Sequence, residues 1–274
     1  MYLAMLLLPA TAFAGALDRI RQEDTLRIAY RADAPPFSYN NDSGKPAGFM
    51  IDLCQAVVQR LAQQLGLPSL KSDYVAVSAA DRFEAIQQNK ADLLCEPTSS
   101  TLSRRKLVDF SVATFVDGAS LMIAPDGPQN LQQLAGRTIG VLAGTTTEQE
   151  LRKSLTDAKI TATVMPAKTH TEGLAMLDEG KTSAYFADRS ILLALIGTSK
   201  APAKLRLADV YLTIETYALA LPRGDDDFRL EVDRALSHIY GSGDINAIFE
   251  RTFGNKVQPG SLLQMIYLLS GLPD

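Results

Sequence analysis

The sequence has little that would support metal, nucleotide or nucleic-acid chemistry. Only two histidines and two cysteines occur in 274 residues, and they are too scattered for a CxxC, HExxH or other zinc-site spacing. There is no GxGxxG fingerprint, and Gly180-Lys181 lacks the earlier glycine that a Walker loop needs. The net charge is −4 without a basic block that could follow a phosphate backbone. We therefore expect no metal, no cofactor and no nucleic-acid partner.

Long apolar runs are also missing, because none reaches the roughly 18 to 20 residues that span a bilayer. The longest lies near the start, where an apolar stretch ends in Ala12-Phe13-Ala14, an A-x-A cleavage pattern before Gly15. We predict that residues 1–14 are a secretory signal peptide and that the protein works in the periplasm. No Lys or Arg precedes the stretch, which leaves a plain hydrophobic tail as the alternative.

The two cysteines matter because of this predicted compartment. In an oxidising space Cys54 and Cys95 can pair as a disulfide. Two buried free thiols that behave as small hydrophobes are the alternative. The sequence leaves both possibilities open.

What is present is ordinary globular composition, with 46% hydrophobic and 21% charged residues, and a length that suggests about two domains. Strand-like and helix-like runs alternate, which is typical of a parallel sheet covered by helices. In the first unit the strands are Thr25–Arg31, Tyr74–Ser78 and Ala91–Cys95, and the helices are Gly48–Leu65 and Ala80–Gln88.

A second alternating unit follows the turn-rich segment 125–128. Its predicted strands are Arg137–Ala143, Ile160–Pro166 and Ser183–Ala187, with helices opening at Gly144 and covering Glu172–Glu179 and Ser190–Ile196. Two units suggest two lobes, and the strand-like segments Leu121–Ile123 and Tyr217–Ala220 suggest two crossings between them. The tail from Asp226 to Leu269 is predicted to be helical and to pack on the first lobe. Within it, Leu262, Leu263, Ile266 and Leu269 form one apolar face, for which we expect docking, with a partner-binding surface as the alternative.

Five short motifs occur together in one order and spacing. They are Arg31–Tyr39 (RADAPPFSY), Gly48-Phe49 with Asp52-Leu53, Thr98–Ser111 (TSSTLSRRKLVDFS), Gly144–Glu148 (GTTTE), and Ala184 with Asp188. With these motifs the chain resembles the polar amino acid binding proteins that serve ABC importers, in particular the glutamate/aspartate-binding type.

The resemblance implies an α/β fold of the type II periplasmic-binding-protein class. Each lobe is then an open mixed sheet with helices on both faces, and a two-segment hinge lets the lobes close over one ligand. We expect lobe 1 to comprise residues 18–121 plus 217–274, and lobe 2 residues 122–216. The implied partners are an amino acid and the membrane subunits of an ABC importer, and a monomer is expected.

The resemblance also implies roles for the groups that bind the amino acid backbone. Arg104 would hold the α-carboxylate, for which a guanidinium fork is suited, with help from Ser99 and from Thr145 and Thr146 at a helix start. Asp188, at the end of a strand, would bind the α-ammonium. The alternatives are a solvated charge for Arg104, a capping loop for Ser99, and N-caps for the threonines and Asp188.

The ligand side chain would meet a second group of residues. Arg31, Arg82 and His170 match positions that contact a side-chain carboxylate in the glutamate/aspartate type, and such a basic trio needs an anion between its members. Pro97 replaces a serine of this type, so only its carbonyl could still meet the ammonium. Arg31 and Arg82 as solvated charges and His170 as a polar loop residue are the alternatives.

We therefore predict a non-catalytic binding protein for an acidic amino acid, glutamate or aspartate. An amide or dicarboxylate ligand stays open. A cyclohexadienyl or arogenate dehydratase on the same fold is one alternative, but an enzyme needs an acid or base left over after ligand pairing. Glu96, beside Pro97, is the one candidate. A ligand-sensing domain is the third possibility.

Overall fold

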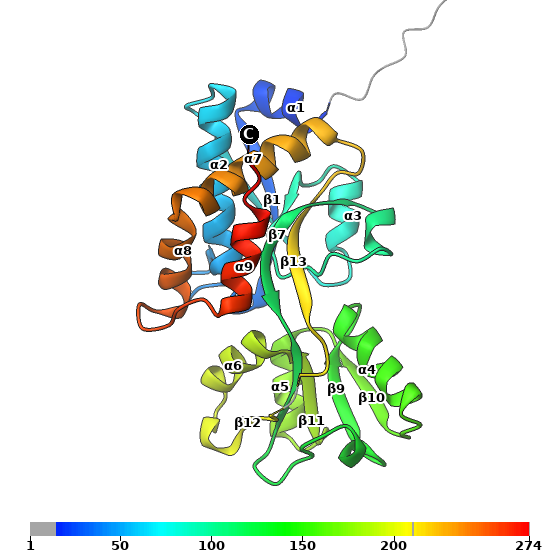
Figure 1. The fold of residues 1–274 in the computed structure, drawn as a ribbon. Coiled ribbons are helices and arrows are strands. Elements are labelled where there is room, and N and C mark those ends of the chain that lie inside the picture. The colour runs from blue at the N-terminus through cyan, green and yellow to red at the C-terminus, as the bar shows by residue number, and fades with distance from the viewer. Residues whose placement is uncertain (1–14, 210, 274) are drawn as a thin grey trace, which may run out of the picture.

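The computed structural model describes residues 15–209 and 211–273, so the predicted signal peptide lies outside the described residues. Two α/β lobes are joined by two long segments, which Figure 1 shows as β7 and β13 passing from the upper to the lower lobe. The described structure has no helix long and apolar enough to cross a bilayer.

The first lobe is built on a five-stranded mixed sheet. Its order is β5 (Lys71–Val77), β1 (Thr25–Arg31), β6 (Leu93–Leu94), β13 (Glu215–Leu221) and β7 (Asp109–Asp117). The first three strands are parallel, and β13 runs antiparallel to both of its neighbours. A small sheet of β2 (Asp33–Ala34), β3 (Ser38–Asn40) and β4 (Pro46–Ala47) lies beside it.

Helices cover both faces of this sheet. In Figure 1, α2 and the C-terminal helices lie on one side and α3 on the other. The helices of the lobe are α1 (Ala16–Glu23), α2 (Phe49–Leu65), α3 (Arg82–Gln87), α7 (Asp226–Ser242), α8 (Asp244–Phe253) and α9 (Ser261–Ser270), and a 3-10 turn, η1, covers Arg104–Lys106.

The helix α2 shows how the sequence produces this packing. Leu53, Val57 and Leu61 follow helical spacing and are fully buried, which stabilises the fold by about 1.5–3 kcal/mol for each side chain. The helix begins after Gly48, whose φ is 116° and where an added Cβ would lie 2.5 Å from the Phe37 carbonyl oxygen. Only glycine fits there, so the RADAPPFSY loop rests directly on the start of α2.

The second lobe has the same plan. Its sheet order is β10 (Thr163–Ala167), β9 (Thr138–Leu142), β11 (Ala184–Asp188), β8 (Ala119–Ile123) and β12 (Arg206–Leu207). Its helices are α4 (Thr146–Asp157), α5 (His170–Asp178) and α6 (Arg189–Thr198), with 3-10 turns η2 at Gln132–Leu134 and η3 at Pro202–Lys204. Successive residues of β11 face opposite sides of the sheet. Phe186 packs in one hydrophobic cluster with Leu151 of α4, whereas Tyr185 packs in a different cluster with Leu174 of α5. The expected fold of two open mixed sheets with helices on both faces is confirmed.

The chain passes between the two sheets twice. It leaves the first lobe at Gly118, because β7 ends at Asp117 and β8 begins at Ala119, and it returns between β12 and β13. At Gly118 an added Cβ would lie 2.5 Å from the Thr213 carbonyl oxygen, so the two crossing segments pack closely. The boundary expected after residue 121 falls inside β8, because strand periodicity does not tell which sheet a strand joins.

A disulfide joins Cys54 of α2 to Cys95, which directly follows β6, with 6.4 Å between their Cα atoms. This bond decides between the two alternatives that the sequence left open. It also links the loop that carries Glu96 and Pro97 to the buried face of α2.

The C-terminal helix α9 docks on the first lobe, but through a different face from the expected one. Its buried side chains are Leu263, Tyr267 and Ser270, and the Tyr267 ring lies 5.1 Å from that of Tyr240. Leu262 and Leu269 are 54% and 68% exposed, so the predicted face was wrong. The polar residues of α9 are only Ser261, Gln264 and Ser270, and two of them are at its ends, so periodicity identifies no single apolar stripe.

Candidate ligand-binding site

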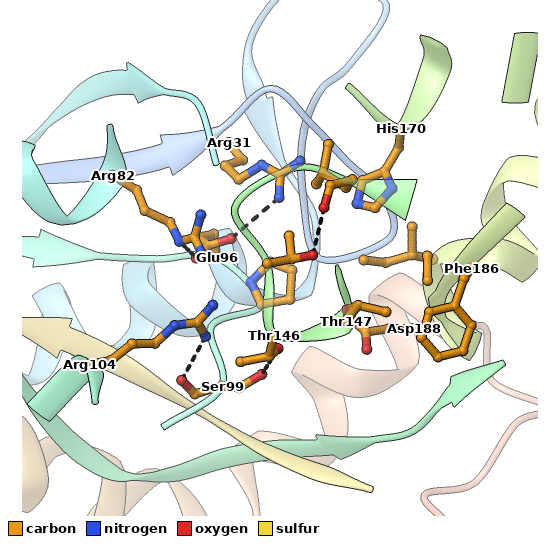
Figure 2. Close-up of a pocket in the computed structure, with 15 residues that line it drawn as sticks. Arg31, Arg82, Glu96, Ser99, Arg104, Thr146, Thr147, His170, Phe186 and Asp188 are labelled. Atoms are coloured by element: carbon orange, nitrogen blue, oxygen red, sulfur yellow. Dashed lines mark hydrogen bonds and ion pairs between the residues drawn. The ribbon is translucent and has the colours of Figure 1, made fainter. Parts of the chain in front are cut away.

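A cavity lies between the two lobes, at the carboxyl ends of strands from both sheets. All nine residues predicted to bind ligand line it, which are Arg31, Arg82, Pro97, Ser99, Arg104, Thr145, Thr146, His170 and Asp188. Figure 2 shows most of these side chains together. The other lining residues are Glu96, Leu142, Thr147, Phe186, Ala187 and Ile191.

Arg31 is the last residue of β1 and is held firmly in place. Its backbone N–H donates to Ser38 Oγ at 3.0 Å, and that hydroxyl donates to the Arg31 carbonyl at 2.8 Å. The guanidinium donates to Asp33 Oδ1 from Nε and Nη2 at 2.9 and 2.7 Å, and its Nη1 lies 3.9 Å from Glu96 Oε2. Arg31 is therefore a buried cation with two carboxylates beside it, not a surface charge.

Arg82, in the first turn of α3, is also buried against a carboxylate. Its Nε lies 3.3 Å from Glu96 Oε1, its guanidinium carbon is 4.7 Å from the centre of the Phe83 ring, and its Nη2 donates to the Gly144 carbonyl of the second lobe at 3.4 Å. Burial lowers the pKa of Arg82, and the Glu96 carboxylate opposes that effect.

Glu96 is the least solvated charged group of the cavity, at 1% exposure. Neither of its carboxylate oxygens has a hydrogen-bond partner among the described residues. Burial raises the pKa of Glu96, and Arg82, Arg31 and Arg104 act in the opposite direction. In Figure 2, Arg31 and Arg82 converge on this carboxylate.

Arg104, in the turn η1, differs from the other two arginines. It is 9% exposed and donates from Nη1 to the Ser99 carbonyl at 2.9 Å. Within the described parts of the chain, no carboxylate lies within ion-pair distance of its guanidinium. Burial, reinforced by Arg82, lowers its pKa to about 10, so it remains charged at neutral pH. A buried cation of this kind needs an anion to offset its desolvation.

The start of α4 faces Arg104 from the second lobe. The Thr145 hydroxyl is used as the N-cap, because it accepts from the Glu148 N–H at 3.1 Å and donates to the Leu142 carbonyl at 2.7 Å. Thr146 Oγ1 donates to Glu215 Oε2 at 2.8 Å and lies 3.2 Å from Ser99 Oγ. The first N–H groups of a helix have no acceptor within the helix, so the turn offers an anion its backbone amides rather than the Thr145 hydroxyl.

His170, the first residue of α5, does not have the charge expected of it. Its Nδ1 lies 3.0 Å from the Tyr185 hydroxyl, and its backbone N–H donates to Asp33 Oδ2 of the first lobe at 3.2 Å. Burial, and secondarily Arg31, lowers the His170 pKa to about 3. The imidazole is therefore neutral, and the predicted basic trio is reduced to two arginines.

Asp188 ends β11 and precedes α6, but its side chain makes no capping hydrogen bond. Burial first, then the carboxylates of Asp117 and Glu215, raise its pKa to about 8. A cationic group beside Asp188 would reverse this shift, because an opposite charge favours the ionised carboxylate. The position is therefore suited to an ammonium.

Four hydrogen bonds between described residues cross from lobe to lobe around the cavity, one of them from Thr146 to Glu215 at the start of β13. The other three join Arg82 to Gly144, Ser99 to Thr146, and Asp33 to His170. The two lobes are thus closed on each other at the site.

Sequence reasoning missed the counter-charges of the site. Asp33 lies within the RADAPPFSY motif, and its spacing from Arg31 was the available signal. For Glu96 the sequence suggests only the role of a catalytic acid. Tyr185, which contacts His170, and Glu215, which contacts Thr146, are remote from these partners in sequence, so no motif indicates them. In residues 15–209 and 211–273, no group of three His, Cys, Asp or Glu side chains is arranged to hold a metal ion.

Comparisons with known proteins agree with this geometry. The sequence profile of the bacterial extracellular solute-binding proteins, family 3, matches residues 26–255. An L-glutamate/L-aspartate-binding protein of Pseudomonas aeruginosa is 31% identical over 94% of this chain and 87% of its own length. A glutamate/aspartate import solute-binding protein of Salmonella typhimurium is 26% identical over 92% and 84%.

A solved structure gives the same result for the fold. An ancestral arginine-binding protein bound to glutamine superimposes with a TM-score of 0.75 and 26% identity, over 85% of this chain and 99% of that one. The chain therefore belongs to family 3 of the bacterial extracellular solute-binding proteins.

Proposed function

We propose that this protein binds an acidic L-amino acid, glutamate or aspartate, in the periplasm and delivers it to the membrane subunits of an ABC importer. The observation that carries the proposal is the pair Arg104 and Asp188. One is a buried guanidinium with no ion-pair partner in the described structure, and the other is a carboxylate whose pKa is raised to about 8. An α-carboxylate and an α-ammonium would satisfy both.

The physical argument is one of desolvation. A zwitterion taken out of water must have both charges paired, or the cost of burying it is not recovered. Arg104 provides two parallel donors for a carboxylate, and the amides at the start of α4 add donors from the second lobe. Bonds to both lobes stabilise the closed arrangement, so ligand binding and closure are coupled.

Arg31 and Arg82 support an acidic side chain at the other end of the cavity. Both are buried and both belong to the first lobe. The names of the Pseudomonas and Salmonella relatives, which bind glutamate and aspartate, point the same way.

The binding function is tested by thermal unfolding of refolded, ligand-stripped protein with a panel of amino acids. A ligand that binds only the folded state adds roughly 4 kcal/mol at about 1,000 times Kd. At about 2–4 °C per kcal/mol for a chain of this size, glutamate or aspartate should raise the melting temperature by roughly 8–16 °C. D-Glutamate and L-arginine serve as controls. If no amino acid shifts the melting temperature by more than about 2 °C, the protein is not an amino acid binder. Delivery is tested separately, by uptake of labelled glutamate in cells with and without this gene.

A further inference from the structure

Glu96 occupies an unusual position for a site that is to receive a second carboxylate. It lies 3.3 Å from Arg82 Nε and 3.9 Å from Arg31 Nη1, and it lines the cavity itself. Both of its oxygens lack a hydrogen-bond partner among the described residues, although the side chain is 1% exposed. A buried carboxylate with unused hydrogen-bonding capacity requires an explanation.

The charges around Glu96 are already balanced within the chain. Two guanidinium groups, Arg31 and Arg82, face two carboxylates, Asp33 and Glu96, and the neutral His170 adds no charge. Arg104, on the remaining side, is the partner of the α-carboxylate under the proposed function. An acidic ligand side chain placed between Arg31 and Arg82 would therefore add a third negative charge to a balanced group.

A third carboxylate beside two guanidinium groups leaves one negative charge uncompensated in a buried site, and each carboxylate then disfavours the charged form of the others. One of them takes up a proton and becomes a hydrogen-bond donor to its neighbour. Asp33 Oδ1 already accepts two hydrogen bonds from Arg31. Glu96 accepts none.

We propose that Glu96 takes up one proton from solvent when an acidic amino acid binds, and that the resulting O–H donates a hydrogen bond to the ligand's side-chain carboxylate. This inference rests on the proposed function. It makes Glu96 a specificity-determining residue: an acidic ligand binds together with a proton, whereas an amide ligand such as glutamine binds without one. Burial raises the pKa of Glu96 even before a ligand is present, which reduces the cost of protonation.

The charged groups that act on the Glu96 carboxylate come from four elements of the first lobe. Arg31 lies on β1, Asp33 on β2, Arg82 on α3 and Arg104 on η1. Within this cluster Glu96 is the carboxylate whose oxygens accept no hydrogen bond from a described residue, so we assign the proton to it. Asp188 titrates as well, but in the opposite direction and for every amino acid, because the ligand ammonium displaces its proton.

Calorimetric titration measures this proton directly. Glutamate is titrated into the wild type, Glu96→Gln and the control Glu84→Gln, at pH 6, 7, 8 and 9, in two buffers of different ionisation enthalpy. Glu84 lies on the exposed face of the same helix as Arg82. Asp188, whose pKa Glu96 also raises, releases its proton with every amino acid. Glutamine is therefore titrated into the same three proteins, and its proton uptake is subtracted from that of glutamate within each protein before the proteins are compared.

We expect the wild type and Glu84→Gln to take up at least about half a proton more than Glu96→Gln at one or more of these pH values. Above the pKa of free Glu96, the wild-type Kd for glutamate should weaken by up to about tenfold per pH unit relative to Glu96→Gln. A difference below about 0.2 proton at every pH would overturn the inference, even if Glu96→Gln changed the affinity, because a purely structural counter-charge alters affinity without altering proton uptake.

The outcomes separate the inference from the proposed function. If no acidic amino acid binds the wild type, both fail. If glutamate binds with equal proton uptake in the wild type and Glu96→Gln, only the role of Glu96 fails. If Glu96→Gln does not fold, the wild type alone decides, through the difference in proton uptake between glutamate and its neutral γ-methyl ester. An excess for glutamate supports the inference, and equal values overturn it.

Discussion

Arg104 and Asp188 face one cavity from different lobes, and the Asp188 carboxylate opposes the effect of burial on the Arg104 pKa. Their surroundings make each group costly to bury alone. Arg104 has a pKa lowered to about 10, and Asp188 a pKa raised to about 8. Both shifts indicate a buried charge without sufficient compensation within the chain, and the proposed zwitterionic ligand would supply the missing partner of each group.

The first prediction concerns Arg104. Arg104→Ala should abolish measurable binding of every amino acid, since each presents the same α-carboxylate. Removal of one partner from a buried charge pair costs about 3–5 kcal/mol, or roughly a hundredfold to several thousandfold in Kd. The exposed neighbour Arg105 provides the control Arg105→Ala, which should bind as the wild type does. Titration calorimetry makes the comparison, and similar losses in both variants would contradict the assignment.

The second prediction concerns the pH dependence that Asp188 imposes. A ligand ammonium requires the ionised carboxylate, and the pKa of Asp188 in the free protein is about 8. A proton must therefore be lost on binding below that pH, so Asp188 should weaken the affinity by up to about tenfold for each pH unit below 8. This trend is measured with a neutral amino acid such as glutamine, for which Glu96 takes up no proton.

Stability should show the reverse trend for the same residue. The pKa of Asp188 is higher in the folded protein than in the unfolded chain, so the folded state holds more protons between about pH 4 and pH 8. Its contribution therefore becomes less favourable as pH rises through that window. Asp188→Asn should melt at a higher temperature than the wild type at pH 8 without ligand, yet show no ligand-induced shift. A lower melting temperature would indicate that the carboxylate stabilises the fold instead.

The third prediction is the contribution of the disulfide. Cys54 and Cys95 are separated by 41 positions in sequence, and closing a loop of that length stabilises a fold by about 3–4 kcal/mol in the chain-entropy treatment. Cys54→Ser/Cys95→Ser should therefore melt roughly 6–16 °C lower. A thiol count on denatured, unreduced wild type should give zero. Because Cys95 precedes Glu96, the variant should also bind glutamate more weakly at a temperature where it is fully folded.

The fold could be predicted where local pattern and burial agree. The alternation of strands and helices and the apolar spacing of α2 follow from sequence, because the buried strands are short apolar runs and α2 buries a single face. The face of α9 could not be predicted, since Leu262 and Leu263 are equally apolar and only the surface of the first lobe decides which is covered. The position of Gly118, rather than residue 121, as the crossing depends likewise on which sheet β8 joins.

The site was predictable in position but not in charge. The resemblance predicted that nine residues share one site, and all nine line the same cavity. The carboxyl ends of the strands meet at one edge of each sheet. The resemblance did not reveal that burial and Arg31 lower the pKa of His170, or that Asp33 and Glu96 already balance Arg31 and Arg82. Those facts depend on distances between residues that are remote in sequence. For Thr145, the same hydroxyl suits a cap and a ligand contact, and only the structure showed which bond it makes.

The last prediction separates the two ends of the ligand. Arg31→Ala and Arg82→Ala should weaken binding of glutamate and aspartate far more than that of glutamine and asparagine, because only the acidic side chains bring a charge to that end. Specificity there is a difference between two affinities, so all four amino acids must be titrated into each variant. Loss of more than about 2 kcal/mol for the acidic ligands and less than about 1 kcal/mol for the amides is expected.

Removal of Arg82 also leaves Glu96 without its nearest cation, which would disturb the site by itself. The double variant Arg82→Ala/Glu96→Gln controls for this effect, because it removes both members of the ion pair. It should recover binding of the amides to near the wild-type affinity while binding of glutamate stays weak. If instead the double variant binds glutamate as well as the wild type does, Arg82 serves only to neutralise Glu96 and does not recognise the ligand.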